Sequence, residues 1–464
     1  MSNAISVITL PIKTEIWQAD IIEKRFDLCR KVYNTLIGYE RKKYRKVIRL
    51  PEYIAAKGIL SEYYKNSERD DDGNITNKKI PAEVKEAKKV INDIYKENGF
   101  SEYSFGKACT EFYQVFKQNI SSMIANRSIA APAWVAFEKL LFKDGKDVHF
   151  KSFGTFDSVV SDCRSGIRLT DEYDKTMFTW NGGKLFVSYG TSKGKTLKMP
   201  VIIDPKDTYK QTMLTRSFRT VRILHKKVRG KMLYYVQITV EGEPAVKLTK
   251  DGKRKHPIGN KKVGIYIDTA SITIATEDSC QTIKFNELHD YSEHDQQINE
   301  INRYLDASKR ISNPENFAED GTIKNGIIKD GVRHKLKWTY SKGYCKARDK
   351  KANIQRVDAE NRKIGHEILA NTIMSYGTDI TMNKFDFKQA QRRKSGNPTK
   401  ADGSPASKAM AGETIKNNAP SMLVTILNRK LASAGFSEVK RVKLEVDRNA
   451  KDYRSRYAKE LQAM

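Results

Sequence analysis

The sequence lacks the features of secreted, membrane-embedded and zinc-ribbon proteins. Its five cysteines lie far apart and include no Cys-x-x-Cys pair, which argues against a disulfide framework and against a cysteine zinc ribbon. No apolar run approaches the roughly 18 residues that a membrane span needs. The segment from Met1 to Pro11 has neither the basic start nor the long apolar middle of a signal peptide. We therefore expect a reduced, cytoplasmic protein that has no membrane partner.

Metal-binding and phosphate-binding motifs are also scarce. The seven histidines show no His-x-x-x-His or His-Glu-x-x-His spacing, and there is no Gly-x-x-x-x-Gly-Lys phosphate loop. We interpret the glycines and lysines of residues 190–195 as a hairpin connection, and His366 as a residue of helix packing or phosphate contact. Enzymatic chemistry of these kinds therefore finds little support.

Acidic residues are outnumbered along the whole chain. The 464 residues include 85 Lys and Arg against 56 Asp and Glu, for a formal net charge of +29, and the excess is not confined to a tail. Such a charge on a folded chain indicates a polyanionic partner. We predict that the partner is nucleic acid, with adsorption to a ribosome-like surface or to anionic lipid as the alternative.

The pattern of apolar residues predicts an α/β protein of two or three domains. A strand near the N-terminus is followed by a helical region, residues 17–142, and then by strands with Gly-rich connections. We expect residues 1–16 and 143–250 to close a small β-barrel into which the helical region is inserted. After a linker, strands alternate with helices over residues 262–464, which predicts an α/β layer structure.

One basic and aromatic segment, Tyr39–Arg49, lies early in the helical region. Tyrosines among cations suit base stacking and phosphate contact. The alternative is a solvated helix face whose tyrosines cover the core, and the sequence leaves both readings open. Lys42, Lys43 and Arg45 are the candidate phosphate contacts of this segment.

A second informative segment begins at Val263. The run of β-branched and small residues from Val263 to Ile272, continuing to Thr276, predicts a buried central strand and its hairpin partner. It resembles the opening strand of RNase H-type nucleases, in which an acidic residue stands in mid-run because Mg²⁺ needs hard oxygen ligands. Here the neutral phenol of Tyr266 stands in that place.

Further motifs resemble those of one family, the transposon-encoded TnpB proteins, whose segment order the miniature type V-F CRISPR effectors share. The resemblance covers essentially the whole chain. The motifs that carry it are Cys29-Arg30-x-x-Tyr33-Asn34, His149-Phe150-Lys151-Ser152, Trp338 through Tyr344, Asn383 through Lys388 and Asn418-Ala419-Pro420-x-Met422.

This resemblance implies a fold and an activity. Residues 1–16 and 143–250 are implied to form a wedge-like β-barrel, residues 17–142 a helical recognition region, and residues 262–464 a RuvC domain, which is RNase H-like. Members of the family use a guide RNA to find DNA and cut it at a RuvC-type site. That site is implied to hold two metal ions between three carboxylates, on the first strand, at the end of a later strand and near the C-terminus.

The sequence departs from this pattern at all three carboxylates. Tyr266 takes the first position and Asn383 the second, and we expect no counterpart of the third aspartate or of the zinc ribbon before Met464. Asp268, two residues beyond Tyr266 and on the same strand face, is the remnant ligand to consider, whereas Asp386 lies past the expected strand end. The chain is therefore predicted to be a degenerate, nuclease-dead variant without a metal cofactor. Mg²⁺ would be needed only by an active nuclease.

What remains without cleavage is binding. We expect an RNA-guided DNA-binding protein, nucleoid-associated, that requires a guide RNA and binds target double-stranded DNA. It would regulate transcription at guide-matched sites by blocking RNA polymerase or by recruiting it with a sigma factor. An active RNA-guided endonuclease and an RNA-binding transposition accessory are the alternatives. The residues expected to contact nucleic acid are Arg30, Tyr33, Asn34, Lys151, Lys388, Arg392 and Arg393.

Several properties stay open at this point. The sequence does not identify the guide RNA, the DNA motif that flanks the target, or the target gene. It also leaves open repression versus activation, the oligomeric state, and whether the C-terminus is native.

Overall fold

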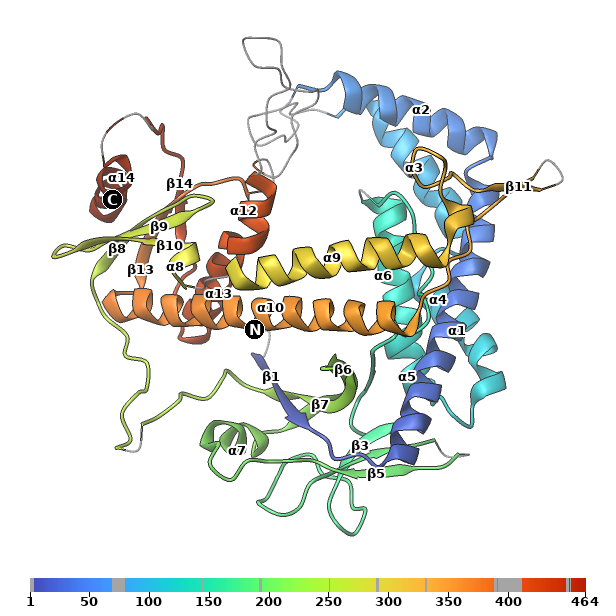
Figure 1. The fold of residues 1–464 in the computed structure, drawn as a ribbon, viewed down its shortest axis with the longest axis horizontal. Coiled ribbons are helices and arrows are strands. Elements are labelled where there is room, and N and C mark those ends of the chain that lie inside the picture. Colours follow the sequence, from blue (N-terminus) through green and yellow to red (C-terminus); the bar gives the residue numbers. More distant parts are fainter. Residues whose placement is uncertain are drawn as a thin grey trace. The chain divides into compact units, whose positions relative to one another are not determined.

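The computed structural model divides the chain into two compact units (Figure 1). Unit 1 comprises Met1–Lys227 and Met232–Ala245, and unit 2 comprises Val228–Lys231 and Val246–Met464. The described residues are 4–68, 80–143, 145–191, 194–249, 251–288, 292–329, 332–387, 390, 411–447, 450 and 452–464. Within these ranges, no helix combines the length and the apolar character needed to cross a membrane.

Unit 1 is built around α1 (Ile16–Val47), a helix of 32 residues. Ile22, Phe26 and Cys29 are buried at helical spacing, so one face of the helix packs into the core of the unit. The remaining helices described in unit 1 are α2 (Pro51–Asn66), α3 (Ala82–Glu97), α4 (Glu102–Tyr113), η1 (Gln114–Phe116), α5 (Ser122–Ile124), the π-helical η2 (Ala125–Ala130), α6 (Ala131–Phe142) and α7 (Thr208–Leu214).

The strands of unit 1 form two antiparallel sheets, ordered β1-β7-β6-β2 and β3-β4-β5. Alternate residues of β7 are buried, as expected for a sheet with one face on the core. The strands are β1 (Ile5–Pro11), β2 (Ser158–Ser161), β3 (Ile167–Thr170), β4 (Phe186–Tyr189), β5 (Leu197–Pro200), β6 (Phe218–Val228) and β7 (Lys231–Glu241).

The expected barrel is not closed among the described residues, and this part of the prediction is corrected. β1 and β2 are the two outer strands of the first sheet, and the second sheet meets it at a single bridge between Ile12 and Val201. Beside that bridge, the Ile202 N–H donates to the Pro11 carbonyl at 2.9 Å. The strands β2 to β5 have four residues each, so each offers few main-chain groups for further pairing around a cylinder.

Unit 2 contains a five-stranded mixed sheet, ordered β10-β9-β8-β13-β14. The central strand β8 (Lys262–Ile267) pairs antiparallel with β9 (Ser271–Ala275) and parallel with β13 (Asp379–Asn383). The outer strands are β10 (Cys280–Lys284), antiparallel to β9, and β14 (Lys440–Val442), parallel to β13. The buried strand and hairpin predicted from Val263 onward are therefore confirmed.

Helices of unit 2 surround this sheet. Leu369 and Ile373 of α10 share a buried apolar cluster with Leu423 and Leu427 of α13, and α9 lies alongside α10 (Figure 1). The elements are α8 (Phe285–Leu288), α9 (Ser292–Ser312), η3 (Pro314–Asn316), the short strands β11 (Ile327–Lys329) and β12 (Val332–His334), α10 (Lys342–Tyr376), α12 (Ala411–Asn418), α13 (Pro420–Ser433) and α14 (Tyr453–Ala463).

From the sequence we expect a long helix over roughly Lys335 to Tyr376, whereas α10 begins at Lys342. Two buried asparagines explain the difference. The Thr339 N–H donates to Asn313 Oδ1 at 2.6 Å, and Asn313 Nδ2 donates to the Thr339 carbonyl at 2.9 Å. Asn316 Nδ2 likewise donates to the Lys337 carbonyl at 2.6 Å. These hydrogen bonds hold the preceding backbone out of the helix.

The C-terminal helix α14 was not predicted. It packs against β8 and β9 of the sheet (Figure 1). Its buried Tyr457 and Leu461 lie four residues apart, which is the helical spacing that signals it. Gly264 permits the close approach, because a Cβ at this position would overlap the main chain of Ala458.

Candidate functional sites

Tyr266 lies in mid-β8, and its ring is packed against α14. Only 2% of its surface is exposed. The ring stacks on that of Tyr457 with centroids 6.0 Å apart and meets the Tyr453 ring edge-on at 5.8 Å. Because strand side chains alternate between faces, Ile265 and Ile267 enter a separate core cluster on the opposite face. Tyr266 therefore fills the position expected for an acid with a packed aromatic ring.

Asn383 ends β13, and its side-chain amide continues the pairing with β8. Asn383 Oδ1 accepts a hydrogen bond from the Ile267 N–H at 2.7 Å, and Asn383 Nδ2 donates to the Ile267 carbonyl at 3.0 Å. The side chain is 4% exposed, and the last main-chain pair of these strands is Met382 with Ile265. The amide thus acts as an additional peptide group in the ladder. A carboxylate has no N–H donor and cannot make both bonds.

Asp268 follows β8 and organises the turn to β9. Its Oδ1 accepts hydrogen bonds from the N–H groups of Ala270 and Ser271, each at 2.8 Å. Its Oδ2 accepts one from Arg454 Nε on α14 at 2.9 Å. Burial lowers the pKa of the Arg454 guanidinium, but the hydrogen bond and the charge of Asp268 outweigh burial, so that pKa is raised. A fixed guanidinium therefore neutralises this carboxylate.

These residues do not fit a two-metal centre. Mg²⁺ prefers an octahedral set of oxygen ligands that includes carboxylates, and among Tyr266, Asp268 and Asn383 only Asp268 is a carboxylate. Its oxygens are engaged by the turn and by Arg454, and the amide oxygen of Asn383 is engaged by β8. In the described part of the chain, no group of three or more His, Cys, Asp and Glu side chains is arranged to hold a metal. We derive no reaction step through a metal.

The second group of motif residues lies in unit 1, where two motifs far apart in the sequence meet. Asn34 Nδ2 on α1 donates to the Lys151 carbonyl at 2.9 Å, and the Lys151 N–H donates to Asn34 Oδ1 at 2.8 Å. The Lys151 ammonium lies 5.3 Å from the ring centre of Tyr33 and 4.6 Å from that of Phe156. Burial raises the pKa of the Tyr33 hydroxyl. Four of the predicted contact residues, Arg30, Tyr33, Asn34 and Lys151, therefore lie together.

Arg30 is oriented by an acidic neighbour. Its Nε donates to Asp27 Oδ1 at 2.7 Å, and Lys31 Nζ lies 3.1 Å from Asp27 Oδ2. Burial raises the pKa of the Asp27 carboxyl, but the hydrogen bonds from Arg30 and Lys31 outweigh it, so the pKa is lowered. The guanidinium also lies 5.9 Å from the ring centre of Phe153. The cluster keeps a positive excess, because one carboxylate faces the charges of Arg30, Lys31 and Lys151.

A pocket of 570 Å³ adjoins this cluster. Its lining combines basic, aromatic and hydroxyl side chains, among them Tyr33, Lys139, Lys151 and Thr155. It also includes the carboxylate of Asp147, which is paired with Arg41 at 3.0 Å. Such a lining suits an anionic ligand with an aromatic part better than a purely apolar one. The geometry is therefore compatible with nucleotide contact.

The cations of the basic segment Tyr39–Arg49 differ in their surroundings, so the two interpretations of this segment apply to different residues. Lys43 Nζ lies 2.8 Å from Glu40 Oε2, so this charge is used inside the unit. Burial raises the pKa of the Glu40 carboxyl although Lys43 lowers it. Lys42 and Arg45 are exposed on the helix. We retain Lys42 and Arg45 as candidate phosphate contacts and interpret Lys43 as structural.

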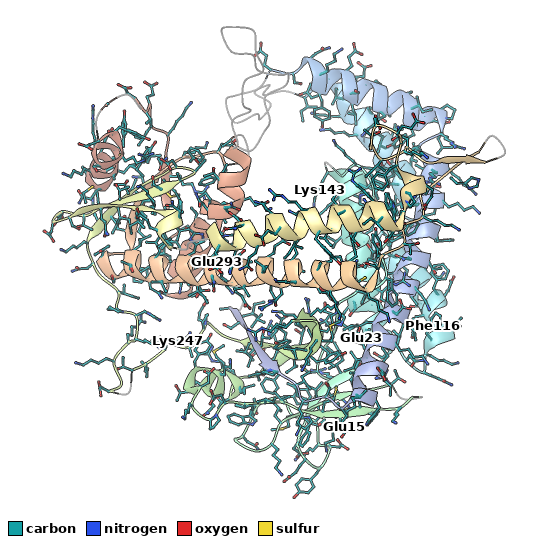
Figure 2. The ribbon with its side chains drawn as sticks, in the orientation of Figure 1. Glu15, Glu23, Phe116, Lys143, Lys247 and Glu293 are labelled. Atoms are coloured by element: carbon teal, nitrogen blue, oxygen red, sulfur yellow. The ribbon has the colours of Figure 1, made fainter. Side chains whose placement is uncertain are left out.

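α1 is also joined to β6 and β7 through Glu23 (Figure 2). His225 Nδ1 lies 2.6 Å from Glu23 Oε1, and the Tyr234 hydroxyl donates to the same oxygen at 2.8 Å. Burial raises the pKa of the Glu23 carboxyl, but the hydrogen bonds from His225 and Tyr234 outweigh it, so the pKa is lowered. This polar contact anchors the helix that carries Arg30 and Asn34.

Other sequence-predicted residues have different outcomes. Lys388, Arg392 and Arg393 lie outside the described residues. His366 is buried, with Nε2 at 2.9 Å from the Asn418 carbonyl and its ring edge-on to that of Phe285 at 5.7 Å. The packing alternative for His366 is therefore the one that the geometry supports.

Arg454 is the principal residue that the sequence did not reveal. Its partner Asp268 is 186 positions away, and no local pattern connects the two. A helix prediction for residues 453–463 would have placed Arg454 on the same helix as the buried Tyr457, but not against Asp268. The contact depends on the packing of α14 on the sheet.

Comparisons with known proteins give limited information. No protein-family model matches the chain, and no curated protein matches it. Among solved structures, it is similar to the protein of a Cas12f1–sgRNA–target DNA complex, with a TM-score of 0.34 and 9% identity over 95% of this chain and 89% of that one. A CRISPR-Cas12f ternary complex gives a TM-score of 0.25 and 10% identity over 96% and 89% of the two chains. For AacC2c1 with sgRNA and extended non-target DNA the values are 0.29 and 7%, over 89% and 61%.

Proposed function

We propose that this protein is a catalytically inactive, RNA-guided DNA-binding protein that regulates transcription at sites matched by its guide. The observation that carries the proposal is the state of the three key side chains at β8 and β13. Tyr266 is packed in an aromatic cluster, Asn383 pairs with the main chain, and Asp268 is neutralised by Arg454. Each is committed to the fold, so none is available to bind a catalytic cation.

Nucleic-acid binding is supported by charge and by position. The net charge of +29 favours a polyanion, and each phosphate neutralised releases counterions, so affinity should fall steeply with salt. The cluster of Arg30, Tyr33, Asn34 and Lys151 joins two motifs that resemble those of guided nucleases. In such proteins, base pairing with the guide selects the sequence while the protein holds backbones and a short flanking motif. A bound protein that does not cut acts as an obstacle or as a recruiter.

Such a protein could regulate transcription by two routes. A guide-matched site that overlaps a promoter would let the protein block RNA polymerase. Binding of a sigma factor would instead recruit the polymerase. A pull-down with purified polymerase and sigma factor, with and without guide-matched promoter DNA, separates the two routes.

The experiment starts from RNA that copurifies with the full chain, because sequencing it identifies the guide. The RNA-loaded protein is then incubated with matched and mismatched DNA duplexes in Mg²⁺. We expect capture of the matched duplex alone and no cleavage of either duplex. The matched control is Asp268→Asn, which keeps one acceptor oxygen for the turn but removes the charge and the second oxygen that accepts from Arg454.

Three outcomes would overturn the proposal. Guide-specific cleavage that Asp268→Asn abolishes would establish the active endonuclease. Tight RNA binding without guide-dependent DNA capture would favour the transposition accessory. Absence of any copurifying RNA, together with weak and salt-insensitive RNA binding, would remove the guide from the mechanism altogether.

A further inference from the structure

The tight turn Ser152–Thr155 in unit 1 presents a large apolar side chain to solvent. The Thr155 N–H and hydroxyl both donate to the Ser152 carbonyl, at 3.2 and 2.7 Å. Gly154 has φ of +75°, a conformation that suits glycine at the third position of such a turn. Phe153, at the second position, is 81% exposed. An exposed ring on a polar turn offers a flat face on which a base can stack.

The turn is held rigidly on α1. The Asn34 amide makes two hydrogen bonds with the main chain of Lys151, the residue before the turn. Phe150, on the other side of Lys151, packs its ring over Gly38 of α1. Because the turn is held in place before binding, less conformational entropy is lost when a ligand stacks on the Phe153 ring.

Cationic side chains lie beside the exposed ring. The Arg30 guanidinium lies 5.9 Å from the Phe153 ring centre. Lys139 and Lys151 line the adjoining pocket of 570 Å³, and the one carboxylate of that lining, Asp147, is paired with Arg41 at 3.0 Å. A planar aromatic surface beside fixed positive charges is the combination that single-stranded nucleic-acid sites use, with the base on the ring and the phosphate on the cations.

We infer that Phe153 is a stacking platform for one unpaired nucleobase, whose neighbouring phosphate is bound by Arg30 and the cations of the adjoining pocket. The inference rests on the proposed function, which supplies single-stranded RNA and a displaced DNA strand. A paired base is excluded as the ligand, because both of its faces are already stacked within the duplex. The RNA and DNA strands share the ligand chemistry, and the experiment below separates them.

Tyr173 provides a matched contrast within the same unit. It is 84% exposed and also lies in a turn, where its N–H donates to Asp171 Oδ1 at 2.9 Å. Its sequence neighbours Glu172 and Asp174 lie 3.5 and 3.0 Å from the ammonium groups of Lys184 and Lys198, so these lysines are already paired with carboxylates. The ring is therefore about equally exposed at both sites, and only the site at Phe153 has a positive excess.

The test compares Phe153→Leu, Phe153→Trp and the control Tyr173→Leu in the full chain. Fluorescein-labelled oligo-uridine and oligo-deoxythymidine of about 12 nucleotides, and a DNA duplex of the same length, are titrated by anisotropy at one salt concentration. We expect Phe153→Leu to weaken single-strand binding roughly 5- to 150-fold, the loss of one stacked base. Phe153→Trp and Tyr173→Leu should bind as the original protein does, and duplex binding should change in none of them.

Each result bears on the inference. Equal binding by Phe153→Leu and the original protein, or an equal loss with Phe153→Trp, would refute stacking. A loss confined to oligo-uridine assigns the platform to RNA, and one confined to oligo-deoxythymidine assigns it to the displaced strand. RNA copurification and capture of guide-matched DNA are measured on the same preparations. A failed platform with retained guide-dependent capture would therefore leave the proposed function standing.

Discussion

Replacing Asn383 by aspartate tests the assignment of its amide to the strand ladder. The substitution keeps the shape of the side chain and the acceptor for the Ile267 N–H, but replaces the Nδ2 donor by an oxygen. The Ile267 carbonyl, which now accepts at 3.0 Å, would then face an acceptor in a buried site. An orphaned buried carbonyl costs about 1–3 kcal/mol.

The charge of the introduced carboxylate adds to this cost. Burial should raise its pKa, and a rise of about two units corresponds to about 2.7 kcal/mol. We therefore expect a total loss of about 4–6 kcal/mol in the stability of unit 2 at neutral pH. For a domain of this size the loss lowers the melting temperature by about 8–24 °C.

The pH dependence has a defined sign. Below the unfolded pKa of about 3.9 the carboxyl is protonated in both states, and its hydroxyl can donate to the Ile267 carbonyl, so the penalty should be smallest there. As the pH rises toward the higher folded-state pKa, only the unfolded state ionises, and the penalty grows. Above the folded-state pKa the penalty is constant.

Scanning calorimetry across pH, with hydrogen exchange of β8 and β13, measures this prediction. The matched control is Asn302→Asp on the exposed face of α9, where the amide oxygen accepts from Lys351 Nζ at 2.6 Å. It should change stability by less than about 0.5 kcal/mol. A melting temperature for Asn383→Asp equal to that of the original protein, or a penalty independent of pH, would refute the reasoning. Stabilisation of the variant by Mg²⁺ would do so as well.

Three further predictions concern other contacts of the two units. Arg454→Ala should destabilise unit 2 by about 1–2 kcal/mol, the loss of a partly exposed ion pair, and so lower its melting temperature by a few degrees. Arg454→Lys should recover part of this stability. An unchanged melting curve for Arg454→Ala would show that Asp268 needs no partner. Glu23→Gln should destabilise unit 1 at neutral pH. The difference in stability between this variant and the original protein should shrink as the pH falls below 4.5, because a carboxyl whose pKa is lowered in the folded state stabilises that state only when it is ionised. A difference in thermal scans that does not change with pH would exclude the pairing with His225. Asn34→Ala should weaken RNA binding without changing the slope of the logarithm of the binding constant against the logarithm of the salt concentration. The substitution removes two hydrogen bonds to the main chain of Lys151 but removes no charge. A changed slope would instead implicate phosphate contacts.

Local patterns in the sequence anticipated the central parts of unit 2. The run of β-branched residues from Val263 predicted β8 and its hairpin, since a strand buried on both faces needs apolar residues at nearly every position. The pairing of the two unit 1 motifs was not foreseen, although Asn34 and Lys151 were each singled out. Their contact spans 117 positions and is set by how the loop after α6 returns to α1.

The predictions of a closed barrel and of the start of α10 were wrong for related reasons. Alternation of apolar residues predicts strands but not which edges pair, so the two sheets of unit 1 could not be distinguished from one cylinder. Before α10, Leu336, Trp338 and Tyr340 alternate with polar residues, which is the spacing of an extended segment. Asn313 holds this segment through two hydrogen bonds with Thr339, a contact across 26 positions that no local pattern shows.

The same pair of hydrogen bonds recurs at three asparagines of the structure. A single asparagine amide both accepts from the N–H and donates to the carbonyl of one residue distant in the sequence. The pairs are Asn34 with Lys151, Asn313 with Thr339, and Asn383 with Ile267. Aspartate and glutamate cannot replace it, because an ionised carboxylate only accepts. At position 383 an ionised acid would therefore lose the hydrogen bond to the Ile267 carbonyl, so pairing with β8 and service as a charged metal ligand compete for this side chain.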